Sequence, residues 1–455
     1  MAAADARFDE LSDLVRAKMG ELAVPGVAVG VLTGDETRTA GFGVTSVEHP
    51  LEVTPQTLFQ IGSITKTFTG TVAMRLVEDG TLELDLPIRS YLPELRLADE
   101  SAAAGVTMRH LLTHTGGWAG DYFDDPGSGD DALQKLVERL DRLEQLTPVG
   151  TIWAYNNAGF YLAGRVIELL AGKPFETVVA ELLLRPLQMS SSFFFPADVM
   201  THRFAVGHTV RDGSASVASP WALARSAAAA GGLASTVEDV LRYARFHLGD
   251  GTAPDGTPIL ARELLEEMRD PQVEIGGLRD DAVGITWMLR ERSGKQIAGH
   301  GGGTMGQISL LTIVPEEQFA VVVLTNADEG GEITLAASTS ALETYCAIED
   351  PEPAAVPRGA EELEEFAGRY SAQLNDIELE PDDGGLKGTM FLKGGFPTPD
   401  TPPPPPFPPG RLVFHDGDRV SGEGELHGAR GEFLRDEAGR IEWFRFGGRL
   451  YRPQR

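Results

Sequence analysis

Residues 57–68 read TLFQIGSITKTF, a short apolar strand pattern that is interrupted at Gly62 and followed by helical spacing. From residue 64 onward, apolar side chains recur every three or four positions until the stop signal Asp79-Gly80. Ser63 is therefore expected at the N-terminus of a helix that follows directly on a strand. Lys66 lies three positions later, so its side chain shares one face of this helix with Ser63.

This pair of side chains has the chemistry of an activated nucleophile. A lysine amine that is held close to a hydroxyl and partly removed from water has a lowered pKa and accepts the serine proton. The helix dipole and the first free N–H groups of the helix favour the oxyanion that follows. The chain contains no other Ser-x-x-Lys, and this one predicts Ser63 as the nucleophile with Lys66 as its proton acceptor.

A second motif, Tyr155-Asn-Asn157, directly precedes a predicted helix over residues 158–170. A phenol near an ammonium group is biased toward phenolate and can relay protons, and the amide of Asn157 can orient a substrate carbonyl or the lysine. The structural alternative is a helix cap made by Asn156 or Asn157, with Tyr155 packed in the core.

A third motif is the run Gly299-His300-Gly301-Gly302-Gly303. Small residues at the edge of a hairpin region allow a substrate carbonyl to approach a strand closely. The alternative is a glycine-rich turn with an incidental histidine.

Around these motifs the sequence predicts an α+β fold. The pattern indicates a helix over residues 6–22 and strands over residues 26–32, 37–44, 283–289, 296–299, 307–314 and 319–325. An antiparallel sheet is thus built from both ends of this part, with helices inserted between them and packed against it.

The last hundred residues are predicted to be a separate small β-barrel. A proline-rich acidic stretch over residues 348–362 reads as a linker between a domain over residues 1–347 and a domain over residues 363–455. Strand-like runs occur at residues 366–370, 377–379, 388–392, 411–414, 431–434, 441–446 and 449–451, with turn signals between them. Residues 397–409 are expected to form an exposed polyproline II loop.

Composition excludes several classes of function. The 455 residues carry a net charge of −29, which repels nucleic acid and anionic lipid. The chain has no run of about 18 to 20 apolar residues, and its first ten residues lack the features of a signal peptide, so we expect no membrane contact and a cytoplasmic location. One cysteine, Cys346, excludes an internal disulfide, and no ligand motif predicts a metal or other cofactor.

Taken together, the three motifs resemble those of the serine beta-lactamase and penicillin-binding-protein superfamily. The chain is most similar to the class C beta-lactamase-like branch, which includes family VIII carboxylesterases and D-aminopeptidases. The segments Leu111-Leu-Thr-His-Thr-Gly-Gly117 and Gly231-Gly-Leu-Ala-Ser-Thr236 look like scaffold motifs of that branch. The resemblance implies a beta-lactamase/transpeptidase-like fold with a helical subdomain, and the C-terminal part is similar to the lipocalin-like barrels of some members.

The resemblance also implies a role for each motif. Ser63 would be the acylated nucleophile, Lys66 and Tyr155 would share the general base and acid work, and Asn157 would orient the substrate. His300 stands at the Lys-Thr-Gly position as a supporting catalytic group, with Gly301, Gly302 and Gly303 along the substrate. The backbone N–H groups of Ser63 and Gly303 would form the oxyanion hole.

His300 and Gly301 depart from the lysine and threonine of that motif, so a permanent cation and a hydroxyl that bind a substrate carboxylate are missing. This departure predicts poor beta-lactam turnover and room for uncharged substrates. We therefore expect a serine hydrolase that cleaves small esters or amides. The alternatives are a D-amino acid-specific peptidase or amidase, an acyl-transferring peptide cyclase, and a catalytically silent sensor protein. A homo-oligomer is possible.

Three further expectations concern the surroundings of the site. His114 reads as a satisfied buried histidine. The acidic and aromatic stretch over residues 118–125 is either a solvated loop or one wall of the substrate cleft. Residues 1–350 are expected to carry the complete catalytic set, so that the chemistry survives removal of the barrel. The barrel would then shape the cleft mouth or join subunits through one face of strand 441–446.

Overall fold

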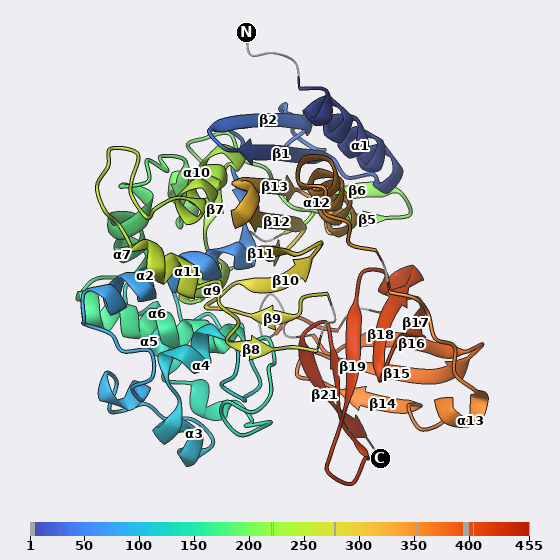
Figure 1. Ribbon diagram of the computed structural model, residues 1–455. Coiled ribbons are helices and arrows are strands. Elements are labelled where there is room, and N and C mark those ends of the chain that lie inside the picture. The colour runs from blue at the N-terminus through green and yellow to red at the C-terminus, as the bar shows by residue number, and fades with distance from the viewer. Residues whose placement is uncertain are drawn as a thin grey trace.

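The computed structural model describes residues 5–219, 221, 223–276, 279–351, 353–394, 400–403 and 405–454. It contains a large α+β part and a β-barrel that carries the C-terminus (Figure 1). The main sheet of the described residues has eight strands in the order β2-β1-β13-β12-β11-β10-β9-β8, and β14 to β21 close the barrel in sequence order. The expected fold class, an antiparallel sheet with helices followed by a small all-β barrel, is confirmed.

Both ends of the large part meet in neighbouring strands near one edge of the main sheet. Strand β1 (Gly26–Thr33) pairs antiparallel with β2 (Glu36–Gly43) on one side and with β13 (Phe319–Thr325) on the other. Strand β12 (Gln307–Val314) follows, and its bounds and those of β13 coincide with the predicted ones. β1 and β13 were predictable because nearly every residue in them is apolar and buried, and β12 because most of its residues are apolar.

Successive side chains of these strands point to opposite faces of the sheet, so the core has two layers. Val27, Val29 and Val31 pack in one apolar cluster with helix α1 (Ala6–Leu22) and helix α12 (Gly330–Cys346). Ala28 and Leu32 point to the opposite face, where helix α10 (Val237–Leu248) covers the sheet. The bounds of α1 coincide with those predicted from its apolar spacing.

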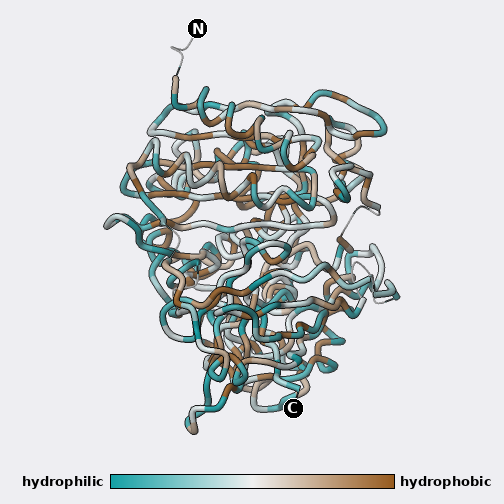
Figure 2. Tube along the Cα trace, turned by 90° about the vertical axis from the view of Figure 1, so that its right-hand side faces the viewer, coloured by the Kyte–Doolittle hydropathy of each residue, from teal (hydrophilic) through white to brown (hydrophobic). Residues whose placement is uncertain are grey.

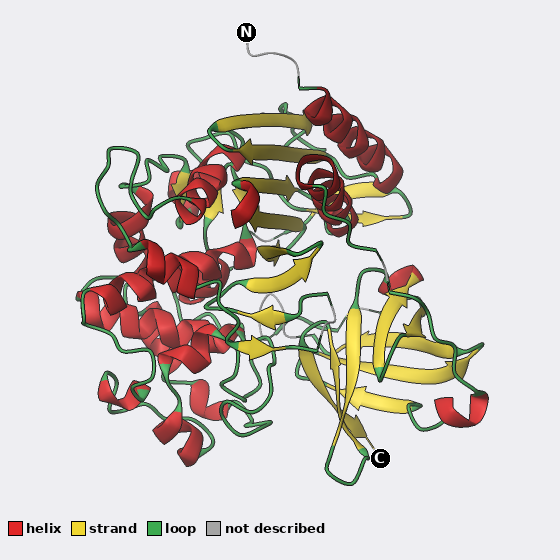
Figure 3. Ribbon diagram, in the orientation of Figure 1, coloured by secondary structure: helices red, strands yellow, loops and turns green. Residues whose placement is uncertain are grey.

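The remaining helices pack on this second face and surround α2 (Thr65–Glu78). They include α4 (Met108–Leu112), α5 (Ala132–Val137), α6 (Asn157–Ala171) and α9 (Ala228–Gly231). Figure 3 shows these helices on one side of the main sheet and α1 and α12 on the other, whereas the barrel lies beside the sheet edge formed by β8 (Val273–Glu274). This arrangement leaves the N-terminus of α2 between the helices, the sheet and the barrel.

The bounds of β1 and β2 differ from the predicted ones by at most one residue at each end, and two other predicted strands differ by more. The run over residues 283–289 is a tight hairpin of β9 (Ala282–Val283) and β10 (Met288–Arg292), because Thr286 adopts a left-handed φ of 68°. Strand β11 (Lys295–Thr304) extends well beyond the predicted residues 296–299, since its glycines pair with β12 instead of forming a turn.

The barrel contains one strand more than the sequence predicts. Its strands are β14 (Gly368–Ser371), β15 (Asn375–Asp382), β16 (Gly385–Leu392), β17 (Gly410–Phe414), β18 (Arg419–Glu423), β19 (Arg430–Arg435), β20 (Ile441–Phe446) and β21 (Arg449–Gln454). β18 was missed because Val420 is its only large apolar side chain. Part of the expected polyproline loop, residues 397–399 and 404, lies outside the described residues, and its other residues form no helix or strand.

The apolar segments lie mainly inside these layers, and Figure 2 shows brown stretches that cross the upper half of the molecule, where the main sheet lies. Within the described residues, no helix is both long and apolar enough to cross a membrane. Cys346 is buried at the end of α12.

Candidate active site

Ser63 lies in a 3-10 turn, Gly62–Ile64, between strand β3 (Phe59–Gln60) and helix α2. Gly62 has a φ of 49°, and a Cβ atom there would lie 2.6 Å from the backbone nitrogen of Gly303. Only glycine permits this close approach of the turn to β11. The predicted strand-to-helix corner is therefore present, and it opens into a cavity of about 520 Å³.

Lys66 is fully buried, and its Nζ lies 3.0 Å from Ser63 Oγ. The same nitrogen donates a hydrogen bond to the carbonyl oxygen of Ala230 at 2.6 Å. Burial, together with the positive charge of Arg449, lowers the pKa of the Lys66 amine well below its usual value. A neutral amine beside the hydroxyl is the state that a general base needs.

Tyr155 and Ser63 line the same cavity, and the Ser63 side chain lies close enough to the phenol to influence its pKa. Burial raises the pKa of Tyr155 to about 12, although the nearby Ser63 side chain and the charge of Arg449 oppose this shift. The expected bias toward phenolate is therefore wrong at neutral pH, because desolvation outweighs the nearby cations. Tyr155 is held as a neutral phenol that can donate a proton.

Asn157 is the first residue of helix α6, and the helix cap is made by Asn156, whose Oδ1 accepts from the backbone of Gly159. The Asn157 side chain is thus not used as the cap. Its Nδ2 donates to Asp121 Oδ1 at 2.8 Å, and the residue lines the cavity.

His300 reaches the cavity from β11, and its ring centroid lies 6.2 Å from that of Tyr155. Its Nδ1 donates to the carbonyl oxygen of Gly301 at 2.6 Å, which leaves Nε2 as an acceptor with no partner among the described residues. Burial and the nearby Lys66 lower the pKa of His300 to about 3, so the imidazole is neutral. No hydrogen bond joins His300 to Tyr155 in the described structure.

The three glycines after His300 line the cavity beside Ser63. A Cβ atom on Gly302 would lie 2.0 Å from the carbonyl oxygen of Ile61, so this strand packs directly against the nucleophile corner. Gly301 and Gly303 have room for a side chain, and their bare backbone leaves space for a ligand.

His114 is buried as predicted, but its hydrogen bonding is not fully satisfied, because Nε2 has no partner among the described residues. The residue also organises the site. Its Nδ1 accepts from the backbone nitrogen of Asn156 at 2.9 Å, and its carbonyl oxygen accepts from Ala154 at 3.1 Å. Its ring stacks on Tyr155 with a centroid distance of 4.4 Å. His114 thus fixes the back of the Tyr155 ring.

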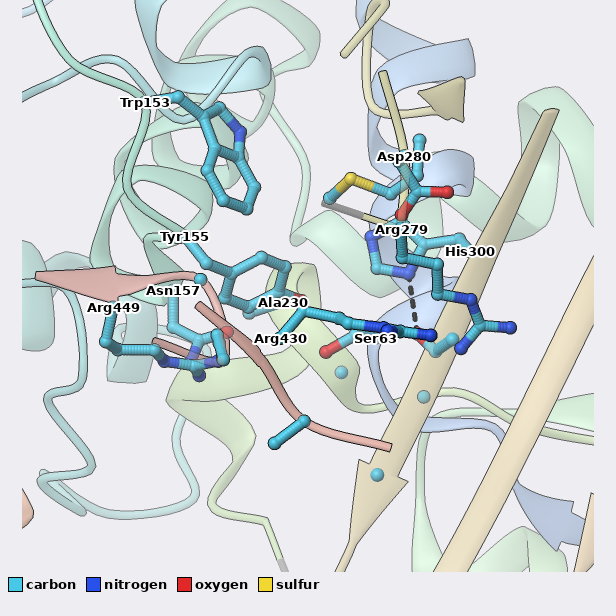
Figure 4. A pocket seen from close by; sticks show the side chains of 18 of the residues that line it. Ser63, Trp153, Tyr155, Asn157, Ala230, Arg279, Asp280, His300, Arg430 and Arg449 are labelled. Atoms are coloured by element: carbon cyan, nitrogen blue, oxygen red, sulfur yellow. Dashed lines mark hydrogen bonds between the residues drawn. The ribbon is translucent and has the colours of Figure 1, made fainter. Parts of the chain in front are cut away.

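Several residues of the cavity carry no sequence signal. The acidic stretch over residues 118–125 does supply one wall, through Phe123, and Asp121 is buried behind it. The barrel supplies a second wall through residues 428–430 and 447–449. The cavity is also lined by the guanidinium groups of Arg279, Arg430 and Arg449. Figure 4 shows Ser63, Tyr155 and His300 around one space, with Arg449 beside Asn157.

This second wall adds barrel residues to the catalytic set that is expected within residues 1–350. The four predicted catalytic side chains do lie before residue 350, but the backbone nitrogen of Tyr155 donates to the carbonyl oxygen of Gly448 in the barrel. Removal of the barrel would break this bond and remove Arg449 from the cavity.

The structure does place Phe444 and Phe446 inside the barrel, while Arg445 on the other face of β20 bonds to the carbonyl oxygens of Trp153 and Ile275. The barrel therefore shapes the cleft, as expected. Within the described residues, no cluster of three or more histidine, cysteine, aspartate or glutamate side chains could hold a metal ion.

Comparison with known proteins shows the family. The beta-lactamase family profile matches residues 11–345, and the chain belongs to this family. It is 32% identical over 400 residues to penicillin-binding protein 4 of Amycolatopsis lactamdurans, a match that covers 86% of this chain and 99% of that protein. The membership expected from the three motifs is confirmed.

Two further proteins resemble the chain. The unguisins hydrolase ungD' of Aspergillus campestris (strain IBT 28561) is 27% identical over 337 residues, 70% of this chain and 61% of that protein. The crystal structure of SurE is 25% identical with a TM-score of 0.74, and the match covers 99% of both chains. The similarity to SurE thus includes the barrel as well as the large part.

Proposed function

We propose that this protein is a serine hydrolase that forms a covalent acyl-enzyme on Ser63. The observation that carries the proposal is the buried Lys66 amine, 3.0 Å from Ser63 Oγ and with a lowered pKa. A hydroxyl is a weak nucleophile unless an adjacent base removes its proton. Lys66 supplies such a base in a position that water does not reach.

The remaining groups fit one reaction sequence. Lys66 accepts the proton as Ser63 Oγ attacks the substrate carbonyl, and the backbone N–H groups of Ser63 and Gly303 stabilise the oxyanion. Tyr155, a neutral phenol beside Ser63, passes a proton to the leaving group. Asn157 orients the substrate from the N-terminus of α6. Water then attacks the acyl group, and the same proton path runs in reverse.

The proposed substrates are small esters or amides, including short peptides. The cavity of about 520 Å³ is of the size that holds a small-molecule substrate, and the glycines of β11 leave the backbone accessible on one side. Trp153 and Met288 add apolar surface to the lining.

A peptide-acting function of the same site is the second candidate. Arg279 and Arg430 bring positive charge to the cavity of a chain whose net charge is −29. A guanidinium group suits a carboxylate, such as a peptide terminus, better than an uncharged ester. The name of the unguisins hydrolase and the structure of SurE with D-Leu also favour a peptide or D-amino acid substrate.

Pre-steady-state kinetics test the proposal. With a p-nitrophenyl ester, we expect a burst of about one equivalent of p-nitrophenol per enzyme, followed by slower turnover. Matched D- and L-amino acid amides then distinguish the two substrate classes. A linear time course without a burst, combined with unaltered activity of Ser63→Ala, would contradict the acyl-enzyme.

His300→Ala is expected to lower kcat by about tenfold without preventing acylation, because the neutral imidazole supports the site and does not take the serine proton. The measurement is kcat on a p-nitrophenyl ester together with the labelling of Ser63 by a fluorophosphonate. If the variant no longer labels, His300 belongs to the proton-transfer machinery instead.

A further inference from the structure

The segment over residues 153–156 is held by the barrel along one side. The backbone nitrogen of Tyr155 donates to the carbonyl oxygen of Gly448 at 2.7 Å, and Arg445 Nη1 donates to the carbonyl oxygen of Trp153 at 3.3 Å. Gly448 has a φ of 78°, and a Cβ atom there would lie 3.1 Å from the Trp153 ring and 3.3 Å from Tyr155 Cβ. The β20–β21 turn therefore lies directly against the catalytic tyrosine.

The next barrel residue, Arg449, contacts two residues of the site directly, Asp121 and Tyr155. Its guanidinium binds Asp121 through two nitrogens, at 3.0 Å and 3.2 Å. Asp121 Oδ1 also accepts from Asn157 Nδ2 at 2.8 Å. The guanidinium carbon lies 4.7 Å from the centroid of the Tyr155 ring. A second barrel residue, Gln373, accepts from the backbone nitrogen of Asp121 at 2.9 Å.

The ion pair of Arg449 and Asp121 is bidentate, a fork-like arrangement with a specific geometry. Arginine binds a carboxylate through two parallel hydrogen bonds, which fixes the direction of both groups, whereas lysine acts as a point charge. The carboxylate in turn fixes the amide of Asn157, and the flat guanidinium covers one face of Tyr155. The groups are thus placed by a residue that comes from the other part of the fold.

We propose that Arg449 is a positioning residue, which through Asp121 holds Asn157 and Tyr155 in their reactive arrangement and so makes the site depend on the docked barrel. This inference rests on the proposed acyl-enzyme function. It assigns a role to the barrel in the reaction at Ser63, beyond shaping the cleft mouth.

The charges of the pair act on the base in opposite directions. The positive charge of Arg449 lowers the pKa of Lys66, whereas the negative charge of Asp121 raises it. Since Lys66 must be neutral to accept the proton, the rate rises as the pH passes through its pKa. The other titratable or charged groups around Lys66 and Tyr155 are His114, Tyr161, Arg279, Asp280, His300 and Arg430.

Arg449→Gln tests the proposal against a matched control. Arg452 lies on the same strand and bridges the same two parts of the fold, through Glu144 at 2.9 Å, but it does not line the cavity. We expect Arg449→Gln to lower kcat/KM about 100-fold, since small misplacements of reacting groups have effects of this size. The acid limb of its pH profile should move to higher pH, while Arg452→Gln stays within about twofold of the wild type.

Two further variants separate charge from geometry. Asp121→Asn should also lower kcat, but with its acid limb moved to lower pH, because a negative charge near Lys66 is lost. Arg449→Lys keeps the charge without the fork, so we expect an acid limb near that of the wild type and a reduced kcat. Melting temperatures of all variants report whether the fold is retained.

Two results would overturn the inference alone. One is Arg449→Gln activity within about threefold of the wild type with an unmoved acid limb. The other is an equal loss in Arg452→Gln, which would show that the contact is merely structural. Failure of the wild type itself to label at Ser63 with a fluorophosphonate would instead overturn the proposed function, and this inference with it.

Discussion

Ser63→Ala is expected to reduce kcat/KM on a p-nitrophenyl ester by at least about 1,000-fold while the fold stays intact. The substitution removes only a hydroxyl from a turn that opens into the cavity, and Lys66 keeps its hydrogen bond to the carbonyl oxygen of Ala230. Without the hydroxyl no acyl-enzyme can form. The measurement is steady-state kinetics together with the melting temperature.

The control for this variant is Ser226→Ala. Ser226 is buried, and its hydroxyl donates to the carbonyl oxygen of Asp124 at 3.1 Å, but it does not line the cavity. We expect its kcat/KM to stay near that of the wild type. Residual activity of Ser63→Ala within about tenfold of the wild type would exclude Ser63 as the nucleophile, since tenfold corresponds to only about 1.4 kcal/mol of barrier.

Lys66→Met and Tyr155→Phe are each expected to lower kcat nearly as much as Ser63→Ala, and the double variant should be little worse than either. Both side chains contact the Ser63 hydroxyl, so each variant breaks the same proton path. When two groups act in the same step, removing either one abolishes that step, so the losses of kcat in the two single variants do not multiply in the double variant.

A complete double-mutant cycle shows whether Lys66 and Tyr155 act in the same proton path. Losses that multiply would show that Lys66 and Tyr155 work in separate steps. The corresponding cycle of Tyr155→Phe with Arg452→Gln serves as the reference for independent sites, because Arg452 has no contact with the Ser63 hydroxyl.

The sequence predicted those parts of the fold in which a local pattern agrees with the tertiary contacts. The bounds of α1, β12 and β13 follow from apolar periodicity and flanking turn signals, and the structure keeps them. The hairpin of β9 and β10 was not predictable, because the left-handed residue of its turn is Thr286, while Gly284, the glycine of this apolar run, has no positive φ. Strand β18 was missed because its side chains are mostly polar or small, so it has no apolar strand pattern.

For the candidate site, the sequence motifs predicted which side chains take part. The structure places these side chains around one cavity, namely Ser63, Lys66, Tyr155, Asn157 and His300. Their protonation states were less predictable. The neutral phenol of Tyr155 and the neutral imidazole of His300 result from burial, which depends on tertiary packing.

The ion pair of Asp121 and Arg449 was invisible in the sequence for a different reason. The two residues are separated by 328 positions, and each stands alone as one charged residue among many. Asp121 lay in a stretch that was equally compatible with a solvated loop. Only the docking of the barrel makes this pair part of the site.

Mass spectrometry of the protein after reaction with a fluorophosphonate tests the central claim most directly. The account predicts one adduct per chain, located on the peptide that contains Ser63, and no adduct on Ser63→Ala under the same conditions. An unmodified Ser63 peptide in active wild-type protein, or an adduct on another serine that accounts for the loss of activity, would contradict it.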